Sequence, residues 1–220
     1  MAAATTTVLV IRDEEFYFQD IIFQVENRLF KVPRYVFLRE SQVFRDLFSL
    51  PVPEGSKPDG ISDARPLKLD GIKALDFSRL LRLLFPQKPD SETLPLKTLD
   101  EWTSVFKLAA QWDMEDVKAK AVQMITPLLE NAPAKQVKMA LEHGVDEWLV
   151  PALNRLVQRE EPMDKTDVDL IGLDFALKVM ALREDCFYNT NNNNTWSIKR
   201  RGKVSMDTSK EIRIRFNIRQ

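Results

Sequence analysis

The sequence contains one histidine, one cysteine and six glycines among its 220 residues. A lone cysteine excludes a disulfide within the chain, and His143 with Cys186 cannot build a zinc site or a multi-histidine metal centre. Any Ser-His-Asp or Cys-His mechanism would have to use His143. The few glycines form no phosphate-binding loop motif. We therefore expect no enzymatic activity, no catalytic residue, no metal and no cofactor.

Long apolar runs are also missing from the sequence. Nowhere do about 18 apolar residues follow one another, so we expect no membrane span. The apolar run Val8–Ile11 is too short for the core of a signal peptide. A single unpaired cysteine suits a reducing compartment. These features predict an intracellular protein of the cytoplasm, the nucleus or both.

The chain as a whole has no excess of charge of one sign, but its parts do. The total of −1 argues against a protein that is basic throughout, as a general nucleic-acid binder would be. Residues 196–220, however, carry eight basic against two acidic side chains, a net charge of +6, which leaves −7 on residues 1–195. The hydrophobic fraction of the whole chain, 44%, is ample for a packed core.

Turn residues and hydrophobic periodicity predict a small sheet followed by helices. Two strands at 20–25 and 28–32 flank Glu26-Asn27, a turn that suits a hairpin with positive φ at Asn27. A third short strand is expected at 66–70. Helices are predicted at five places, namely after Pro33, after a Ser41 cap, over 72–85, after an Asp100 cap and after an Asp113 cap.

The second half shows helical patterns with breaks at glycine and proline. We expect a short new turn at Thr126-Pro127 and helices over 133–143, 146–159, 166–171 and 173–188. His143 before Gly144 suits a helix C-terminus, and the acidic cluster at 164–169, which lacks the pattern of a calcium loop, is interpreted as helix capping. The order of elements predicts an α+β fold in which helices dominate and an all-helical extension ends the folded part.

The sequence after Asn191 does not continue this pattern. Four consecutive asparagines favour turns and disorder, so we expect a disordered linker and tail over 191–220. Within the tail, apolar and basic residues alternate over 211–219, which indicates a strand at a sheet edge or an unfolded segment. A third alternative is that the tail is incidental sequence.

Three segments in the first half resemble a known family. Asp20-Ile21 opens a strand, Phe30-Lys31-Val32-Pro33-Arg34 leads into a helix, and Ser41-Gln42-Val43-Phe44-Arg45-Asp46-Leu47-Phe48 follows. Their order and spacing resemble a BTB/POZ domain, although Pro33 stands where the family usually has histidine. The resemblance implies a small sheet capped by helices over 16–130. Residues 16–188 as a whole are similar to fungal BTB proteins, which implies a helical extension over 131–190.

The resemblance implies protein binding rather than catalysis. In similar BTB dimers the residues that match Asp20 and Arg34 line a charged pocket near the two-fold interface, where carboxylate and guanidinium stabilise each other. We expect the chain to homodimerise through the face that contains the hairpin and the 33–48 helices, and to act as a scaffold or adaptor for a further protein. The alternative for Asp20 and Arg34 is an ordinary strand start and a solvated charge.

Two other candidate sites bear on the partner. BTB proteins that recruit cullin-type ubiquitin ligases often carry a hydrophobic-x-acid triplet in the 72–86 helix, where this chain has Phe77-Ser78-Arg79. A base in place of the acid weakens the prediction of a substrate adaptor for such a ligase, and the spacing of Phe77 also suits the core. The run Lys199, Arg200, Arg201 and Lys203 is a candidate for nuclear import or phosphate contact, which makes transcriptional or chromatin regulation an alternative.

Overall fold

The computed structural model describes residues 11–51, 55, 57–86, 96–190 and 207–218, with the side chains of 186–190 left aside. The chain divides into two compact units, Met1–Ile125 and Thr126–Gln220. The boundary falls slightly before the predicted domain end at residue 130. Unit 2 includes the described part of the predicted tail.

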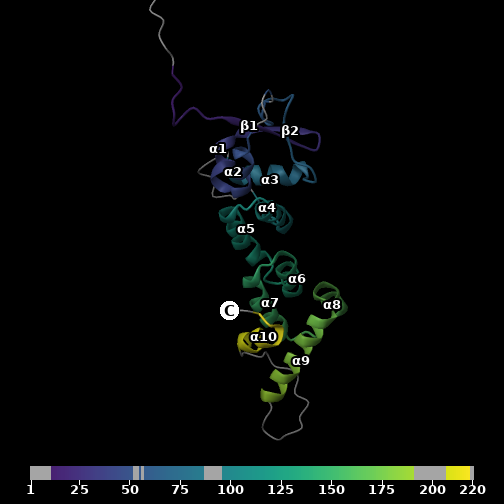
Figure 1. Cartoon of the computed structure of the whole chain (residues 1–220). Coiled ribbons are helices and arrows are strands. Elements are labelled where there is room, and N and C mark those ends of the chain that lie inside the picture. The colour runs from purple at the N-terminus through teal and green to yellow at the C-terminus, as the bar shows by residue number, and fades with distance from the viewer. Residues whose placement is uncertain (1–10, 52–54, 56, 87–95, 191–206, 219–220) are drawn as a thin grey trace, which may run out of the picture. The chain divides into compact units, whose positions relative to one another are not determined.

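Unit 1 contains a three-stranded sheet in the order β2-β1-β3 (Figure 1). The antiparallel hairpin of β1 (Asp20–Val25) and β2 (Arg28–Pro33) confirms both predicted strands, and β3 (Leu67–Lys68) pairs parallel to β1. The positive φ of the turn lies at Glu26 (53°) rather than at Asn27. The Glu26 carboxylate also accepts a hydrogen bond from the backbone N–H of Ala74 at 3.0 Å, so the turn caps the start of α3.

Three helices pack against the sheet and enclose an aromatic core. They are α1 (Arg34–Glu40), α2 (Gln42–Ser49) and α3 (Ala74–Leu84), and Ser41 caps α2 as predicted, since its hydroxyl accepts from the N–H of Phe44. Ring contacts with centroid distances of 4.9 to 5.9 Å join Phe23, Phe37, Phe44, Phe77 and Trp112. Large buried aromatic rings contribute much of the stability of such a core.

Two further helices follow, with caps that differ from the prediction. α4 (Leu99–Gln111) begins at a capping box in which Thr98, rather than Asp100, accepts from the N–H of Glu101. α5 (Glu115–Leu128) starts after Asp113, whose φ is +54°, so Asp113 makes the turn between the helices instead of capping the second. Pro127 lies inside α5 and does not start a new turn. The boundary between the two units falls within α5.

Unit 2 is helical throughout its described part. It contains α6 (Pro133–His143), α7 (Asp146–Gln158), α8 (Lys165–Ile171), α9 (Leu173–Thr190) and α10 (Ser209–Phe216). His143 ends α6 and Gly144 follows with φ of +64°, which confirms the predicted C-cap. Asp164 caps α8 in a capping box with Asp167, as the capping interpretation of the acidic cluster requires. Trp148 is buried in unit 2, and its indole N–H donates to the hydroxyl of Thr126 at 2.9 Å.

The helix α10 lies where the sequence predicted disorder or a strand. Ile212 and Phe216 are buried, whereas Ile214 between them is exposed. A spacing of four residues places two side chains on one face of a helix, and α10 contacts α7 and α9 through that face (Figure 1). The expectation of an unfolded or extended segment was therefore wrong for residues 209–216, because a distant apolar surface selects the helical alternative.

Candidate interaction site in unit 1

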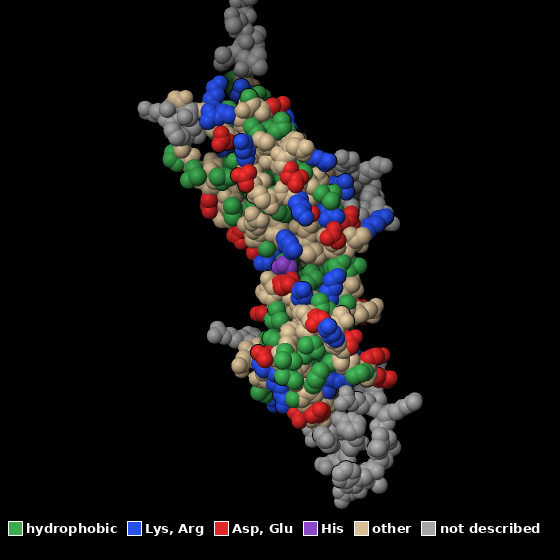
Figure 2. Space-filling model, turned by 90° about the vertical axis from the view of Figure 1, so that its right-hand side faces the viewer, with side chains coloured by type: hydrophobic (Ala, Val, Ile, Leu, Met, Phe, Trp, Pro, Cys, Tyr) green, Lys and Arg blue, Asp and Glu red, His purple; other side chains and the backbone are tan. Residues whose placement is uncertain are grey.

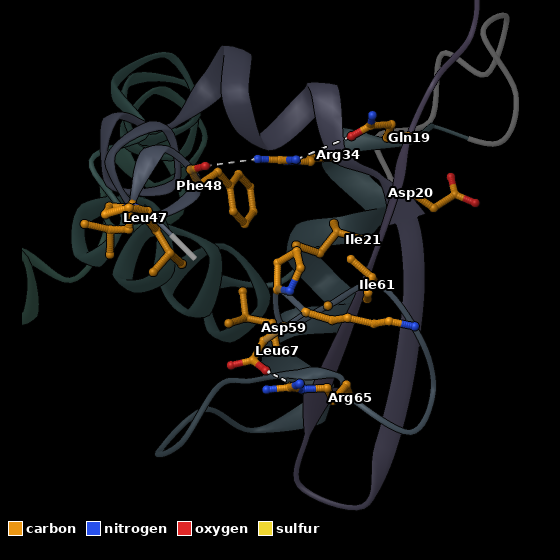
Figure 3. A pocket seen from close by; sticks show the side chains of 15 residues that line it. Gln19, Asp20, Ile21, Arg34, Leu47, Phe48, Asp59, Ile61, Arg65 and Leu67 are labelled. Atoms are coloured by element: carbon orange, nitrogen blue, oxygen red, sulfur yellow. Dashed lines mark hydrogen bonds and ion pairs between the residues drawn. The ribbon is translucent and has the colours of Figure 1, made fainter. Parts of the chain in front are cut away.

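A cavity of about 420 Å³ lies between the start of the sheet and the end of α2 (Figure 3). Its wall combines charged and apolar side chains. The main lining residues are Gln19, Asp20, Ile21, Arg34, Leu47, Phe48, Leu50, Asp59, Gly60, Ile61, Arg65 and Leu67. The cavity therefore contains both residues that the sequence analysis placed in a charged pocket.

Arg34 connects the sheet with α2 at the base of this cavity. Its guanidinium donates to the side-chain carbonyl of Gln19 and to the backbone carbonyl of Phe48, each at 3.4 Å, and lies 4.3 Å from the centroid of the Phe48 ring. Such a cation–π contact adds to the two long hydrogen bonds. The Nε atom of Arg34 is buried and has no hydrogen-bond partner within the described residues. One donor of the guanidinium is thus left unused.

Asp20 lines the same cavity but does not pair with Arg34. Its carboxylate lies 3.4 Å from the Nζ atom of Lys31, and Figure 3 shows it turned away from Arg34. Because Asp20 pairs with Pro33 across the hairpin, Lys31 is its diagonal neighbour on the adjacent strand. Within a single chain the carboxylate of Asp20 and the guanidinium of Arg34 therefore do not meet. The predicted role of both residues near a dimer interface stays a prediction.

The cavity also contains residues that the sequence reasoning did not single out. Arg65 forms an ion pair with Asp59 at 3.4 Å across the loop that closes the cavity. The backbone of Gly60 joins this loop to β1, because its carbonyl accepts from the N–H of Ile22 at 2.8 Å. The opposite charges of Asp20 and Lys31, at diagonal positions of a predicted hairpin, could have indicated their contact. No sequence pattern near Arg34 identifies its contact with Phe48.

At the second candidate site, on α3, both side chains contact other residues of unit 1. Phe77 is fully buried in the aromatic core, as the spacing of the helix allowed. The guanidinium of Arg79 lies 3.0 Å from the carboxylate of Asp76 and 2.8 Å from that of Asp100, and donates to the hydroxyl of Ser104. With 13% of its side chain exposed, Arg79 ties α3 to α4.

The start of α4 next to this network is strongly hydrogen-bonded. The backbone N–H groups of Lys97 and Thr98 donate to the carboxylate of Glu101, at 2.9 and 3.0 Å. These bonds hold the pKa of Glu101 below its ordinary value, with the nearby Arg79 charge acting in the same direction. The charged side chains of Arg79 and Glu101 therefore form contacts within unit 1 that hold α3 and the start of α4 together.

The third candidate site, Lys199, Arg200, Arg201 and Lys203, lies outside the described residues. Among the described residues no group of three or more His, Cys, Asp or Glu side chains is placed to hold a metal ion. None of the described helices is long and apolar enough to cross a bilayer.

Comparison with known proteins assigns the first half of the chain. No curated protein matches the sequence. Residues 10–127, more than half of the chain, match the family model described as BTB/POZ domain, and the match covers the hairpin, α1 to α4 and nearly all of α5. The small sheet with helices packed on it agrees with that assignment, and such domains bind other proteins. The chain belongs to the BTB/POZ domain family.

Proposed function

We propose that the chain homodimerises through unit 1 and acts as a scaffold or adaptor for a second protein. The observation that carries the proposal is an exposed aromatic cluster at the start of α1. Phe16, Phe18 and Tyr35 are all solvent-exposed, and the rings of Phe18 and Tyr35 lie 5.0 Å apart. Contiguous exposed apolar surface is uncommon on monomeric proteins and marks interaction sites.

Further apolar side chains are exposed on α2 and directly after it. Val43, Leu47 and Leu50 are exposed, and Leu47 and Leu50 also line the cavity that contains Arg34. An interface over this face would combine an apolar centre with charged groups at its side, which is the usual arrangement of protein interfaces. These residues belong to the face that the sequence analysis assigned to self-association.

Neither alternative partner receives comparable support. Phe77 is buried and Arg79 is held by two carboxylates, so α3 offers little of the contact expected for a cullin-type ligase. On the face seen in Figure 2, basic and acidic side chains are interspersed rather than gathered into a basic patch of the kind that nucleic acid requires. The basic run at 199–203 keeps nucleic-acid binding as a separate prediction for the tail.

Light scattering coupled to size exclusion tests the proposal. The wild-type chain at micromolar concentration should give twice the 25.5 kDa mass of one chain. Tyr35→Asp places a charge in the proposed interface and should shift the mass to that of the monomer. Leu75→Asp is the matched control, because Leu75 is also a large exposed apolar residue but lies on α3. A monomeric wild type, or loss of the dimer in both variants, would contradict the proposal.

A further inference from the structure

The short helix α10 covers a surface formed by α7 and α9. Two apolar side chains anchor it: Ile212 is fully buried, and the ring of Phe216 packs 5.1 Å from that of Phe175 on α9. Lys178 of α9 places its Nζ atom 5.7 Å from the centroid of the Phe216 ring. The α7–α9 surface, as we call it, therefore presents an apolar patch with a cation at its side.

Polar groups fix the start of α10 on the same surface. The side-chain carbonyl of Asn154, on α7, accepts from the hydroxyl of Thr208 at 2.6 Å and from its backbone N–H at 3.3 Å. The amide of Asn154 in turn donates to the carboxylate of Asp207 at 3.3 Å. One side chain of α7 thereby recognises the two residues before a helix, so the α7–α9 surface specifies the direction of the helix that it binds.

The fit of α10 on this surface is incomplete. Arg215 forms an ion pair of 2.6 Å with Asp185 of α9, yet its other terminal nitrogen is buried and has no hydrogen-bond partner within the described residues. A buried donor without a partner weakens an interface. The helix has eight residues and no side-chain cap, and helices of this length are marginal in isolation. The helical conformation of α10 therefore depends on its docking. The unpartnered nitrogen of Arg215 makes the binding free energy of α10 less favourable than this surface allows.

We propose that the α7–α9 surface is a binding site for a short amphipathic helix of another protein, and that α10 is its intramolecular occupant. The partner helix would carry a hydroxyl or carboxylate before its first turn to meet Asn154, and two apolar residues spaced four apart to replace Ile212 and Phe216. A cation beside the second of them would meet Asp185. This inference rests on the proposed function as an interaction module and adds a second contact, on unit 2.

A second copy of this chain is the less favoured occupant. α10 belongs to the same chain as α7 and α9, so its docking is intramolecular, and intramolecular docking of this kind gives an effective concentration on the order of millimolar. The α10 of another copy makes the same contacts and cannot compete with the intramolecular one. A foreign helix without the unpartnered nitrogen of Arg215 has an advantage over α10, and binding to it would release α10.

The experiment compares two variants of the full chain. Ile212→Asp places a carboxylate at a residue that is 0% exposed and should vacate the surface, whereas Ile214→Asp makes the same change two residues away at 70% exposure. A fluorescently labelled peptide of residues 207–218 serves as the probe, and its anisotropy reports binding. We expect affinity for the Ile212→Asp chain to exceed that for the wild-type and Ile214→Asp chains by at least about 10-fold.

Controls in the probe separate specific docking from adhesion. A peptide with Ile212→Asp should bind the vacated chain at least about 30-fold more weakly, since Ile212 is a buried anchor. The Ile214→Asp peptide should bind like the original. Phe216→Ala in the chain is a milder second variant that also weakens the intramolecular contact but leaves α7 and α9 unchanged. Circular dichroism checks that each variant keeps its helices. Equal binding to all chains, or none to a folded vacated chain, would overturn the inference.

The same variants distinguish helix binding by unit 2 from dimerisation through unit 1. Light scattering should give the same mass for the wild-type and Ile212→Asp chains, because the proposed dimer uses unit 1. A mass that falls to the monomer only in Ile212→Asp would assign the surface to exchange of α10 between copies and overturn a foreign partner. A monomeric wild type that still shows the expected probe affinities would refute the dimer alone.

Discussion

The buried hydroxyl of Ser41 donates a hydrogen bond to the backbone carbonyl of Trp112, 71 residues further along the chain. The same oxygen accepts from the N–H of Phe44 at 3.1 Å and so caps α2. One side chain thus serves the start of α2 and the end of α4. This explains physically why a serine stands at the head of the motif that carries the family resemblance.

Ser41→Ala should lower the free energy of unfolding by about 2–4 kcal/mol. Loss of an N-cap costs about 1 kcal/mol, and the buried carbonyl of Trp112 is left without its partner, which costs about 1–3 kcal/mol more. Urea denaturation followed by tryptophan fluorescence measures the change. Ser49→Ala removes an exposed hydroxyl at the other end of α2 and should change the stability by less than about 0.5 kcal/mol. Equal losses would show that the link between Ser41 and Trp112 contributes nothing.

Gly60→Ala should disturb the cavity that contains Arg34. Gly60 has φ of +85°, and a Cβ atom there would lie 2.8 Å from the Ile21 side chain, which also lines the cavity. Gly71 has φ of +76° but open space around it, so Gly71→Ala measures the backbone cost alone, about 1–2 kcal/mol. Gly60→Ala should cost about 1–3 kcal/mol beyond that. Equal midpoints in thermal unfolding of the two variants would contradict the predicted clash.

Arg79→Glu should destabilise unit 1 rather than create a ligase contact. The new carboxylate would face Asp76 and Asp100 and leave the hydroxyl of Ser104 without its present donor. We expect a loss of about 2–3 kcal/mol in urea unfolding. Arg82→Glu, at an exposed position one turn further along α3, should change the stability by less than about 1 kcal/mol. A variant as stable as the wild type would mean that the network does not hold α3 to α4.

Local chemistry made much of unit 1 predictable. The two hairpin strands follow from the pattern within each strand and the turn between them. The Ser41 cap and, in unit 2, the His143–Gly144 helix end depend on neighbours within four residues, and each of these features is found at its predicted place. Asp20 and Arg34 were likewise found from short sequence segments, namely those that resemble the family. Where the deciding partner lies far away in the sequence, local reasoning fails, as it did for the cap at Glu26, which is set by Ala74.

Residues 209–216 of the tail show most clearly what could not be predicted from the sequence. Alternating apolar residues over 211–219 fit a strand better than a helix, and no pattern within the tail distinguishes Ile212 from Ile214. The contacts of Thr208 with Asn154 and of Phe216 with Phe175 dock α10 on α7 and α9, and the docked helix has Ile212 buried and Ile214 in solvent. The partner of Asp20 was missed for the same reason, since the hairpin register places Lys31 beside it.

The ion pair of Asp167 with Arg159 should make the stability of unit 2 depend on acid pH. Burial alone would raise the pKa of Asp167, but the hydrogen bonds from Arg159 and the N–H of Asp164 outweigh it and hold the pKa below its ordinary value of 3.8. A carboxyl group with a depressed pKa in the folded state stabilises the fold above its unfolded pKa. This contribution is lost as the pH falls from about 4 through the folded pKa.

Asp167→Asn should therefore lower the free energy of unfolding by about 1–3 kcal/mol at pH 7, the range for hydrogen bonds to a charged group. The difference from the wild type should shrink as the pH falls below about 4, because the wild type then loses the charge as well. Asp169→Asn, on the same helix but exposed, is the matched control and should show neither effect. Urea titrations of unfolding at pH 7 and at pH 3 measure both. A difference that stays constant between these pH values would mean that the charge of Asp167 does not stabilise unit 2.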